Sequence, residues 1–208
     1  MLKVGYKIMM EHISKNHKFA LMMDSEKKYL HQLAALIPNG GIVLEVGTFL
    51  GASSSIMAHA NPNITIHTID MYWDDHDRDR PWVQDMLNSA LGKFQPRTLE
   101  SVSKIVSEYK NIKLYKGFSP KHFMDWNIEI DLYFEDGFHT NPRLENNINF
   151  WSKFIKKRGY LVLHDHRPNL PIGHPSRFVD TETCAVSLLN EGYKKIDQID
   201  GMLILQKL

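Results

Sequence analysis

The sequence predicts an α/β protein with one doubly wound sheet of seven, mostly parallel strands. Short apolar runs alternate with stretches of helical periodicity, which is typical of β-α units in a parallel sheet. Five such units follow one another. Near the C-terminus, Asp200-Gly201 separates two further apolar runs, and this pattern indicates a tight hairpin. We therefore expect five parallel strands followed by a hairpin that introduces one late antiparallel strand.

Composition bounds the size and class of the protein. The 208 residues suit one domain, or one domain with a small lid, and the net charge is +1. No run of Lys and Arg interleaved with aromatics is present, so we expect no nucleic-acid partner. No stretch approaches the roughly 20 apolar residues of a membrane span, and we expect no signal peptide. The single cysteine, Cys184, excludes an internal disulfide and fits a reducing, cytoplasmic location.

The chain divides into an N-terminal arm, residues 1–22, and one domain, residues 23–208. The arm shows no clean periodicity, and it would cover the site or pack on a partner subunit in a homo-oligomer. Asp24 or Ser25 is the expected N-cap of the first helix of the domain. Gly40-Gly41 would end that segment.

The stretch from Ile42 to Ser54 is the most informative part of the sequence. Residues 42–47 form a short apolar strand, and Gly47 and Gly51 punctuate the turn before a helix over 52–60. A strand, a glycine turn and a helix together place a nucleotide at a helix N-terminus. Many such turns bind nothing, and the spacing here differs from that of dinucleotide binders.

The second strand, 64–69, ends at Asp70. A carboxylate at this tip is placed to accept hydrogen bonds from ribose hydroxyls, and the alternative is a helix cap or loop carboxylate. The following segment, 73–110, is long for one crossover. It would carry a substrate lid over its charged and aromatic part, 73–82, or form a solvated loop with an ordinary crossover helix. Expected apolar helix positions are Met86, Leu87, Leu91, Phe94, Leu99, Val102, Ile105 and Val106.

The third strand, 112–115, is followed by a loop where an adenine ring would rest. Gly117, Phe118 and Ser119 are the candidates for that contact. Ser119 is also the expected N-cap of a helix that has Pro120 as its first residue.

The remaining elements follow the same alternation. A fourth strand over 130–136 precedes a helix that begins at Asn141-Pro142. Its apolar spacing, and three basic residues before Gly159, predict that it continues to 156–158. The other expected elements are a strand over 160–163, a helix near 180–191 and hairpin strands over 193–199 and 202–205.

Acidic and imidazole side chains gather at the ends of strands four and five. Asp136 and Asp165 end adjacent strands, and two close carboxylates repel unless a cation or a proton lies between them. A divalent metal would satisfy them: Mg or Ca with oxygen ligands alone, or Mn, Fe, Ni or Zn where His139, His164 or His166 joins. The alternative is that Asp165 caps a loop, His164 is packed and His166 faces solvent.

His139 follows the tip of strand four by three residues, within reach of a ligand there. It would act as a general base, or it would hydrogen-bond the helix start near Asn141. Cys184 has no histidine at a suggestive spacing, so we interpret it as a core residue.

Four motifs together resemble one family over residues 25–208. They read V-L-E-V-G-T-F-L-G-A-S-S from Val43, I-D at 69–70, D-L-Y-F-E-D-G-F-H-T from Asp131 and G-Y-L-V-L-H-D from Gly159. They resemble class I S-adenosylmethionine (SAM) dependent methyltransferases, in the branch of the cephalosporin hydroxylase-like and macrolide sugar O-methyltransferases. This resemblance implies a Rossmann-like sheet in the order 3-2-1-4-5-7-6.

The resemblance also implies roles for individual residues. Asp136 and Asp165 match metal-holding positions of the metal-dependent members, with His164 and His166 beside Asp165, and His139 matches a proposed base. Both neighbours of Asp165 are histidines where relatives carry an acid or an amide, which puts Mg in doubt. Phe138 stands where a small residue is expected and would reshape the substrate pocket. The implied SAM contacts are Glu45, Gly47, Thr48, Phe49, Gly51, Ser53, Ser54, Asp70, Met71, Gly117, Phe118, Ser119 and Asp136.

The expected function is transfer of the SAM methyl group to a hydroxyl of a small molecule, such as a sugar or a diol, with a divalent metal as a possible helper. Two alternatives stay open: a non-catalytic binding or assembly protein on the same fold, and a nicotinamide-dependent oxidoreductase. The glycine spacing and the terminal hairpin disfavour the oxidoreductase.

Overall fold

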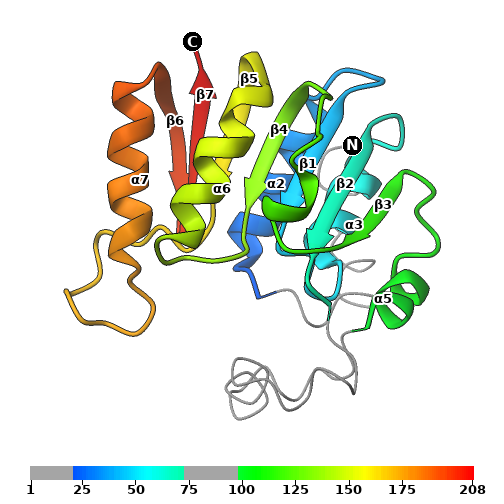
Figure 1. Ribbon diagram of the computed structural model, residues 1–208, viewed down its shortest axis with the longest axis horizontal. Coiled ribbons are helices and arrows are strands. Elements are labelled where there is room, and N and C mark those ends of the chain that lie inside the picture. Colours follow the sequence, from blue (N-terminus) through cyan, green and yellow to red (C-terminus); the bar gives the residue numbers. More distant parts are fainter. Residues whose placement is uncertain (1–20, 73–97) are drawn as a thin grey trace.

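The computed structural model describes residues 21–72 and 98–208, which form a seven-stranded sheet with helices on both faces (Figure 1). The strand order is β3-β2-β1-β4-β5-β7-β6. β1 to β5 are parallel, and β7 runs antiparallel to both β5 and β6. This confirms the predicted fold class and strand order. The strands are β1 (Ile42–Val46), β2 (Thr65–Asp70), β3 (Ile112–Lys116), β4 (Ile130–Glu135), β5 (Ile155–Leu163), β6 (Tyr193–Ile199) and β7 (Met202–Lys207).

Successive residues of each central strand point to opposite faces, and both faces are covered. One face packs against α2 (Asp24–Ala35) and α3 (Ala52–Ala60), and the other packs against α6 (Arg143–Trp151) and α7 (Val179–Asn190). In β1, Val43 packs in the core under α2 and α3, and the next residue, Leu44, packs in the core under α6 and α7. Burial on both faces explains why these strands are continuously apolar in sequence.

The order of the strands places β1 between β2 and β4. The chain moves outward from β1 to β2 and β3, and then returns to β4 on the other side. The carboxyl ends of the parallel strands meet at one edge there, and this switch point is where ligands bind in open α/β sheets.

The helix after β4 is shorter than predicted. α6 ends at Trp151, a 3-10 turn covers Ser152–Phe154, and Ile155 already begins β5. Ile155 pairs with Ile130 of β4, so the sheet takes these residues in place of the helix. The predicted helical stop at Gly159 is therefore wrong: Gly159 lies within β5, where an added Cβ would come within 3.1 Å of the Asp131 carbonyl oxygen.

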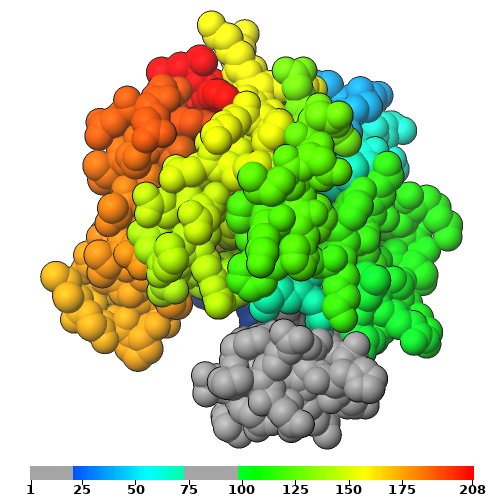
Figure 2. Space-filling model, in the orientation of Figure 1, coloured from blue at the N-terminus to red at the C-terminus, as the bar shows by residue number. Residues whose placement is uncertain are grey.

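The prediction of a helix after β3 is also wrong in its extent. Only a three-residue 3-10 helix, η3 (Lys121–Phe123), forms, and Pro120 rather than Ser119 precedes it. Phe123 and Trp126 of this segment pack against the core, and the Trp126 and Trp151 rings lie 5.3 Å apart. Figure 2 shows this green segment beside α6 on the near face. Aromatic packing thus covers the sheet where a longer crossover helix was expected.

The first helix begins one residue earlier than a cap at Asp24 would place it, and two residues earlier than a cap at Ser25. Met23 occupies the N-cap position of α2, and the Glu26 carboxylate accepts a hydrogen bond from the Met23 amide at 2.8 Å. No helix of the described ranges is long and apolar enough to cross a membrane.

Residues 1–20 of the arm and 73–97 of the expected lid lie outside the described residues. After them, α5 (Leu99–Ile105) packs with buried Val102 and Val106, while Ile105 is exposed on the surface.

Candidate active site

A cavity of about 500 Å³ opens at the carboxyl edge of the sheet, where β1, β2, β4 and β5 end. The end of the N-terminal arm, Leu21 and Met22, contributes to its wall. Nine of the predicted cofactor residues line it: Gly47, Thr48, Phe49, Ser53, Asp70, Met71, Gly117, Ser119 and Asp136. So do His139, His164 and Asp165, together with Phe138, Arg143 and Phe178.

The glycine turn after β1 brings two strand ends into contact. Gly47 has a φ of +99°, and its amide donates to the Ile69 carbonyl oxygen at 2.9 Å. A Cβ at Gly47 would lie 2.2 Å from the carbonyl oxygen of Asp136, which is backbone and cannot move aside. Both the conformation and the contact therefore require glycine.

Glu45 supports this turn from behind. Its side chain is 0% exposed and accepts hydrogen bonds from the hydroxyls of Ser53, Ser54 and Thr68. Burial raises the pKa of Glu45 to about 7, although the three hydroxyl donors oppose that rise. Of the predicted SAM contacts, Glu45, Gly51, Ser54 and Phe118 are not among the residues that line the cavity. Glu45 and Ser54 instead fix the start of α3 against β1 and β2.

Asp70 lies at the tip of β2 and lines the cavity, as predicted. One carboxylate oxygen accepts from the Phe49 amide at 2.9 Å, and the other accepts from the Tyr72 amide at 3.1 Å. Asp70 thus joins the glycine turn to the end of β2. Its contact with a ribose stays a prediction.

The Ser119 hydroxyl is already engaged inside the protein. It donates to the Asn147 side-chain oxygen at 2.9 Å and accepts from the Trp151 indole at 2.8 Å. Gly117 and Ser119 still line the cavity, so their contribution to an adenine contact would come from surface shape and backbone.

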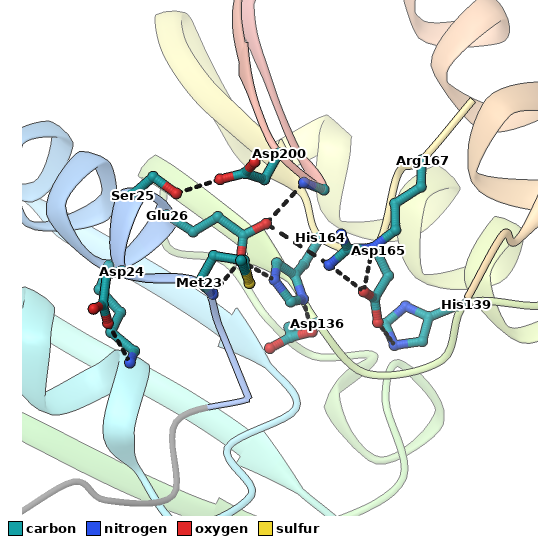
Figure 3. A network of polar contacts seen from close by, with 12 residues as sticks. Met23, Asp24, Ser25, Glu26, Asp136, His139, His164, Asp165, Arg167 and Asp200 are labelled. Atoms are coloured by element: carbon teal, nitrogen blue, oxygen red, sulfur yellow. Dashed lines mark hydrogen bonds and ion pairs between the residues drawn. The ribbon is translucent and has the colours of Figure 1, made fainter. Parts of the chain in front are cut away.

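A chain of charged groups runs from Asp136 and His164 in the cavity wall to the buried Glu26 (Figure 3). His164 Nδ1 lies 2.8 Å from Asp136 Oδ1, and His164 Nε2 lies 3.3 Å from Glu26 Oε2. Burial opposes protonation of His164, but Asp136 and Glu26 outweigh it and hold the pKa of His164 well above its ordinary value. Within this chain His164 acts as an imidazolium between two carboxylates.

Glu26 anchors this chain to two other segments. It is 0% exposed, and its oxygens accept from the amides of Met23 and Gly201, both at 2.8 Å. The neighbouring Ser25 donates to Asp200, so the α2 start and the β6–β7 hairpin are joined twice. No sequence signal pointed to Glu26, because Met23 at the N-cap is not one of the residue types that mark a helix start.

Asp136, His139 and Asp165 form a second group, facing the cavity. One ligand atom from each can be chosen so that all lie within 4.8 Å of one another. His139 Nε2 is 3.4 Å from Asp165 Oδ2, and Arg167 is 3.4 Å from Asp165 Oδ1. The two carboxylates and one imidazole are a donor set that divalent metals such as Mn or Zn accept.

The two other predicted metal ligands are not members of this group, although His164 contacts Asp136. Both His164 nitrogens face carboxylates of Asp136 and Glu26. His166 is buried rather than solvent-facing, and burial lowers its pKa. Neither histidine joins the group that Asp136, His139 and Asp165 form.

Aromatic rings form the outer wall beside His139. The Phe178 ring lies 4.9 Å from the His139 ring, and Phe138 lies 6.0 Å from Phe118. Phe138, flagged in the sequence as unusually large, therefore lies in the cavity wall. No sequence pattern indicated Phe178, because it follows an irregular loop.

The fold and the site together define a class I methyltransferase. Residues 44–166 match the model of a methyltransferase domain family. The chain belongs to this family, which confirms the resemblance to the class I SAM-dependent methyltransferases and favours it over the oxidoreductase.

Solved structures with the same fold have varied functions. The O-methyltransferase TomG of Streptomyces achromogenes, in complex with SAM, is 17% identical, with a TM-score of 0.62 over 96% of this chain and 89% of TomG. A methyltransferase of Geobacter sulfurreducens is 15% identical, with a TM-score of 0.61 over 98% and 90%. An rRNA methylase of Streptococcus thermophilus is 13% identical, with a TM-score of 0.57 over 91% and 99%. At these identities the likeness concerns the fold, and it does not identify the methyl acceptor.

Proposed function

We propose that this methyltransferase transfers the methyl group of SAM to a hydroxyl of a small-molecule acceptor, a sugar or a diol. The observation that carries the proposal is one cavity that has two chemically different ends. The glycine turn at Gly47 and the side chain of Asp70 form one end. Asp136, His139 and Asp165 form the other, where a hydroxyl can be held and deprotonated.

The cofactor would occupy the first end. Gly47, Thr48 and Ser53 offer a close backbone approach for the methionine part, and Asp70 lies where ribose hydroxyls would come. Asp136 touches both ends, because its backbone approaches Gly47 and its carboxylate belongs to the group with His139 and Asp165. A carboxylate there would stabilise the positive sulfonium, consistent with the methyl group facing the second end.

Transfer needs alignment and removal of one proton. The acceptor oxygen forms a bond to the methyl carbon while the carbon–sulfur bond breaks, which leaves S-adenosylhomocysteine. The hydroxyl proton passes to His139. Nε2 of His139 faces Asp165, so Nδ1 is the nitrogen that would take the proton.

The residues present also fit a divalent metal. Asp136, His139 and Asp165 would hold it, and the imidazole favours Mn, Fe, Ni or Zn over Mg. When bound, a metal lowers the pKa of a coordinated hydroxyl and fixes its position. His139 would then serve as a ligand, so the base and the ligand are alternative roles of one side chain.

Thermal stability measured with added ligands tests which cofactor binds and whether a metal binds beside it. A ligand at about 100 times its dissociation constant stabilises by roughly 2.7 kcal/mol, about 5–10 °C for a chain of this size. We expect a shift with SAM and S-adenosylhomocysteine but not with NAD. A further shift with Mn or Zn that EDTA removes would support the metal site.

Labelled methyl transfer from SAM to hydroxyl compounds tests the reaction itself. Transfer that requires a free hydroxyl and is lost with the methyl ether of the same compound supports O-methylation. Binding of SAM with methylation of nitrogen or carbon acceptors only would overturn it. Binding of SAM without turnover of any acceptor would favour the non-catalytic alternative.

A further inference from the structure

Arg143 is a charged residue in the cavity wall that the proposed transfer does not use. It is the first residue of α6, and its side chain is exposed. The guanidinium carbon lies 4.3 Å from the centre of the Phe138 ring and 5.2 Å from that of Phe118. The two rings lie 6.0 Å apart at an interplanar angle of 29°, so together they hold the guanidinium.

No carboxylate within residues 21–72 and 98–208 forms an ion pair with Arg143. Two other arginines near the cavity differ. Arg167 contacts Asp165 at 3.4 Å, and Arg177 contacts Glu182 at 2.7 Å. A guanidinium stacked on aromatic rings keeps its N–H groups available at its edge, where they match a carboxylate or phosphate with two hydrogen bonds.

Arg143 is not at this position because it stabilises α6. A cation in the first turn of a helix is unfavourable because the helix N-terminus is itself positive. Glu145 supplies the favourable acidic residue of that turn. Arg143 therefore adds positive charge where the helix already favours an anion.

The acidic groups nearby do not exclude an anion from this corner. Asp136 is paired with His164 at 2.8 Å, and Asp165 is flanked by His139 and Arg167. Much of their negative charge is thus offset within the protein. Arg143 lines the same cavity as Asp165 and His139, so an acceptor that reaches His139 can also reach Arg143.

We propose that Arg143, held by Phe138 and Phe118, binds a carboxylate or phosphate group of the methyl acceptor. This inference rests on the proposed function and narrows it to hydroxyl compounds that carry an anionic group. Hydroxy acids and sugar phosphates are the two classes with this chemistry.

Matched probe pairs test the subsite without knowledge of the natural acceptor. The enzyme saturated with S-adenosylhomocysteine is titrated with catechol and 3,4-dihydroxybenzoate, and with glucose and glucose 1-phosphate. We expect the anionic member of one pair to bind at least about 10-fold tighter than its neutral partner, with a preference that falls as salt rises. The pair that shows the preference identifies carboxylate or phosphate as the group bound.

Three variants assign the preference to Arg143. Arg143→Gln should abolish it, and Arg143→Lys should retain only part of it, because lysine keeps the charge without the two-pronged geometry. Arg158→Gln is the control, since Arg158 is exposed on β5 and does not line the cavity.

The outcomes separate this inference from the proposed function. Failure to bind S-adenosylhomocysteine would reject the proposed function. Normal cofactor binding with no anion preference in either pair, including no binding of any probe, would overturn the Arg143 subsite alone. A loss of S-adenosylhomocysteine affinity in Arg143→Gln would assign Arg143 to the cofactor's carboxylate and would also overturn it.

Discussion

The two ends of the cavity are built in different ways. At the cofactor end, the glycine turn and the start of α3 follow β1 directly, and a buried carboxyl, Glu45, binds hydroxyls eight and nine residues along the chain. At the end proposed for the acceptor, Asp136 contacts His164, which in turn meets the buried Glu26 from a position 138 residues away in the chain. At the first end, the Asp70 and Glu45 carboxyl groups bind backbone amides and hydroxyls, whereas at the second the carboxylates contact imidazole and guanidinium groups.

This difference indicates which end can vary. At the end proposed for the cofactor, backbone contacts fix the turn at Gly47, so we expect a side chain there to disturb the fold as well as binding. The acceptor end is a set of side chains mounted on strand tips and loops. Its residues can change while the sheet persists, which fits the varied methylases that share this fold at low identity.

The largest expected effect is at Gly47. Gly47→Ala forces a Cβ into the Asp136 backbone and a side chain onto a φ of +99°, so we expect a loss above about 4 kcal/mol and no binding of S-adenosylhomocysteine. Chemical denaturation and calorimetry would measure both. Gly173→Ala is the control: its φ is +87°, but no atom lies within 4 Å of the added Cβ, so only about 1 kcal/mol is expected. Similar losses in both variants would contradict the role of the strand contact.

The next effect isolates chemistry from binding. His139→Ala should lower kcat by about 10²–10⁴-fold while the affinity for S-adenosylhomocysteine stays within about twofold, because the ring contacts Asp165 at the acceptor end. Steady-state kinetics and calorimetry would show the split. His174→Ala, on an exposed loop, is the control. Unchanged turnover in His139→Ala would remove it as base and as ligand.

Breaking the chain of Glu26, His164 and Asp136 should lower the free energy of unfolding by about 3–5 kcal/mol. His164→Asn leaves the Glu26 and Asp136 carboxylates without their shared cation, and buried unpaired charges are costly. Glu26→Gln in the same chain should recover part of the loss, which a double-mutant cycle by urea denaturation would measure. Ser25→Ala removes only the contact to Asp200 and serves as the control. Additive losses would show that Glu26 and His164 are not coupled.

The smallest effect is a pH dependence at the cofactor end. The folded-state pKa of Glu45, about 7, is above its ordinary value near 4.5, so its contribution to stability is present in full below pH 4.5 and is lost as pH rises through 7. The contribution is at most about 3 kcal/mol. The difference in unfolding free energy between wild type and Glu45→Gln should therefore decrease from pH 4.5 to 8. A difference that is constant with pH would show that Glu45 does not titrate in this range.

The sequence by itself determined the strands of the sheet and the glycine turn after β1. Apolar runs, glycine turns and an Asp-Gly hairpin act locally, so the strands, the turn at Gly47 and the place of Asp70 followed from short stretches. The order of the strands came from the resemblance to a known family. The sequence also placed Asp136, His139 and Asp165 at one edge, because parallel strands end together. The end of α6 was predicted wrongly because pairing of Ile155 with Ile130 overrides helical spacing.

Only the tertiary structure decided which of the gathered groups contact each other. His164 was a metal candidate in sequence, yet Glu26 from α2 reaches its second nitrogen and makes it an ion-pair partner. Arg143 was not predicted from the sequence as a site residue. Its stacking on Phe138 places it in the cavity wall. Contacts between side chains distant in sequence depend on how helices pack on the sheet, and local patterns do not encode that packing.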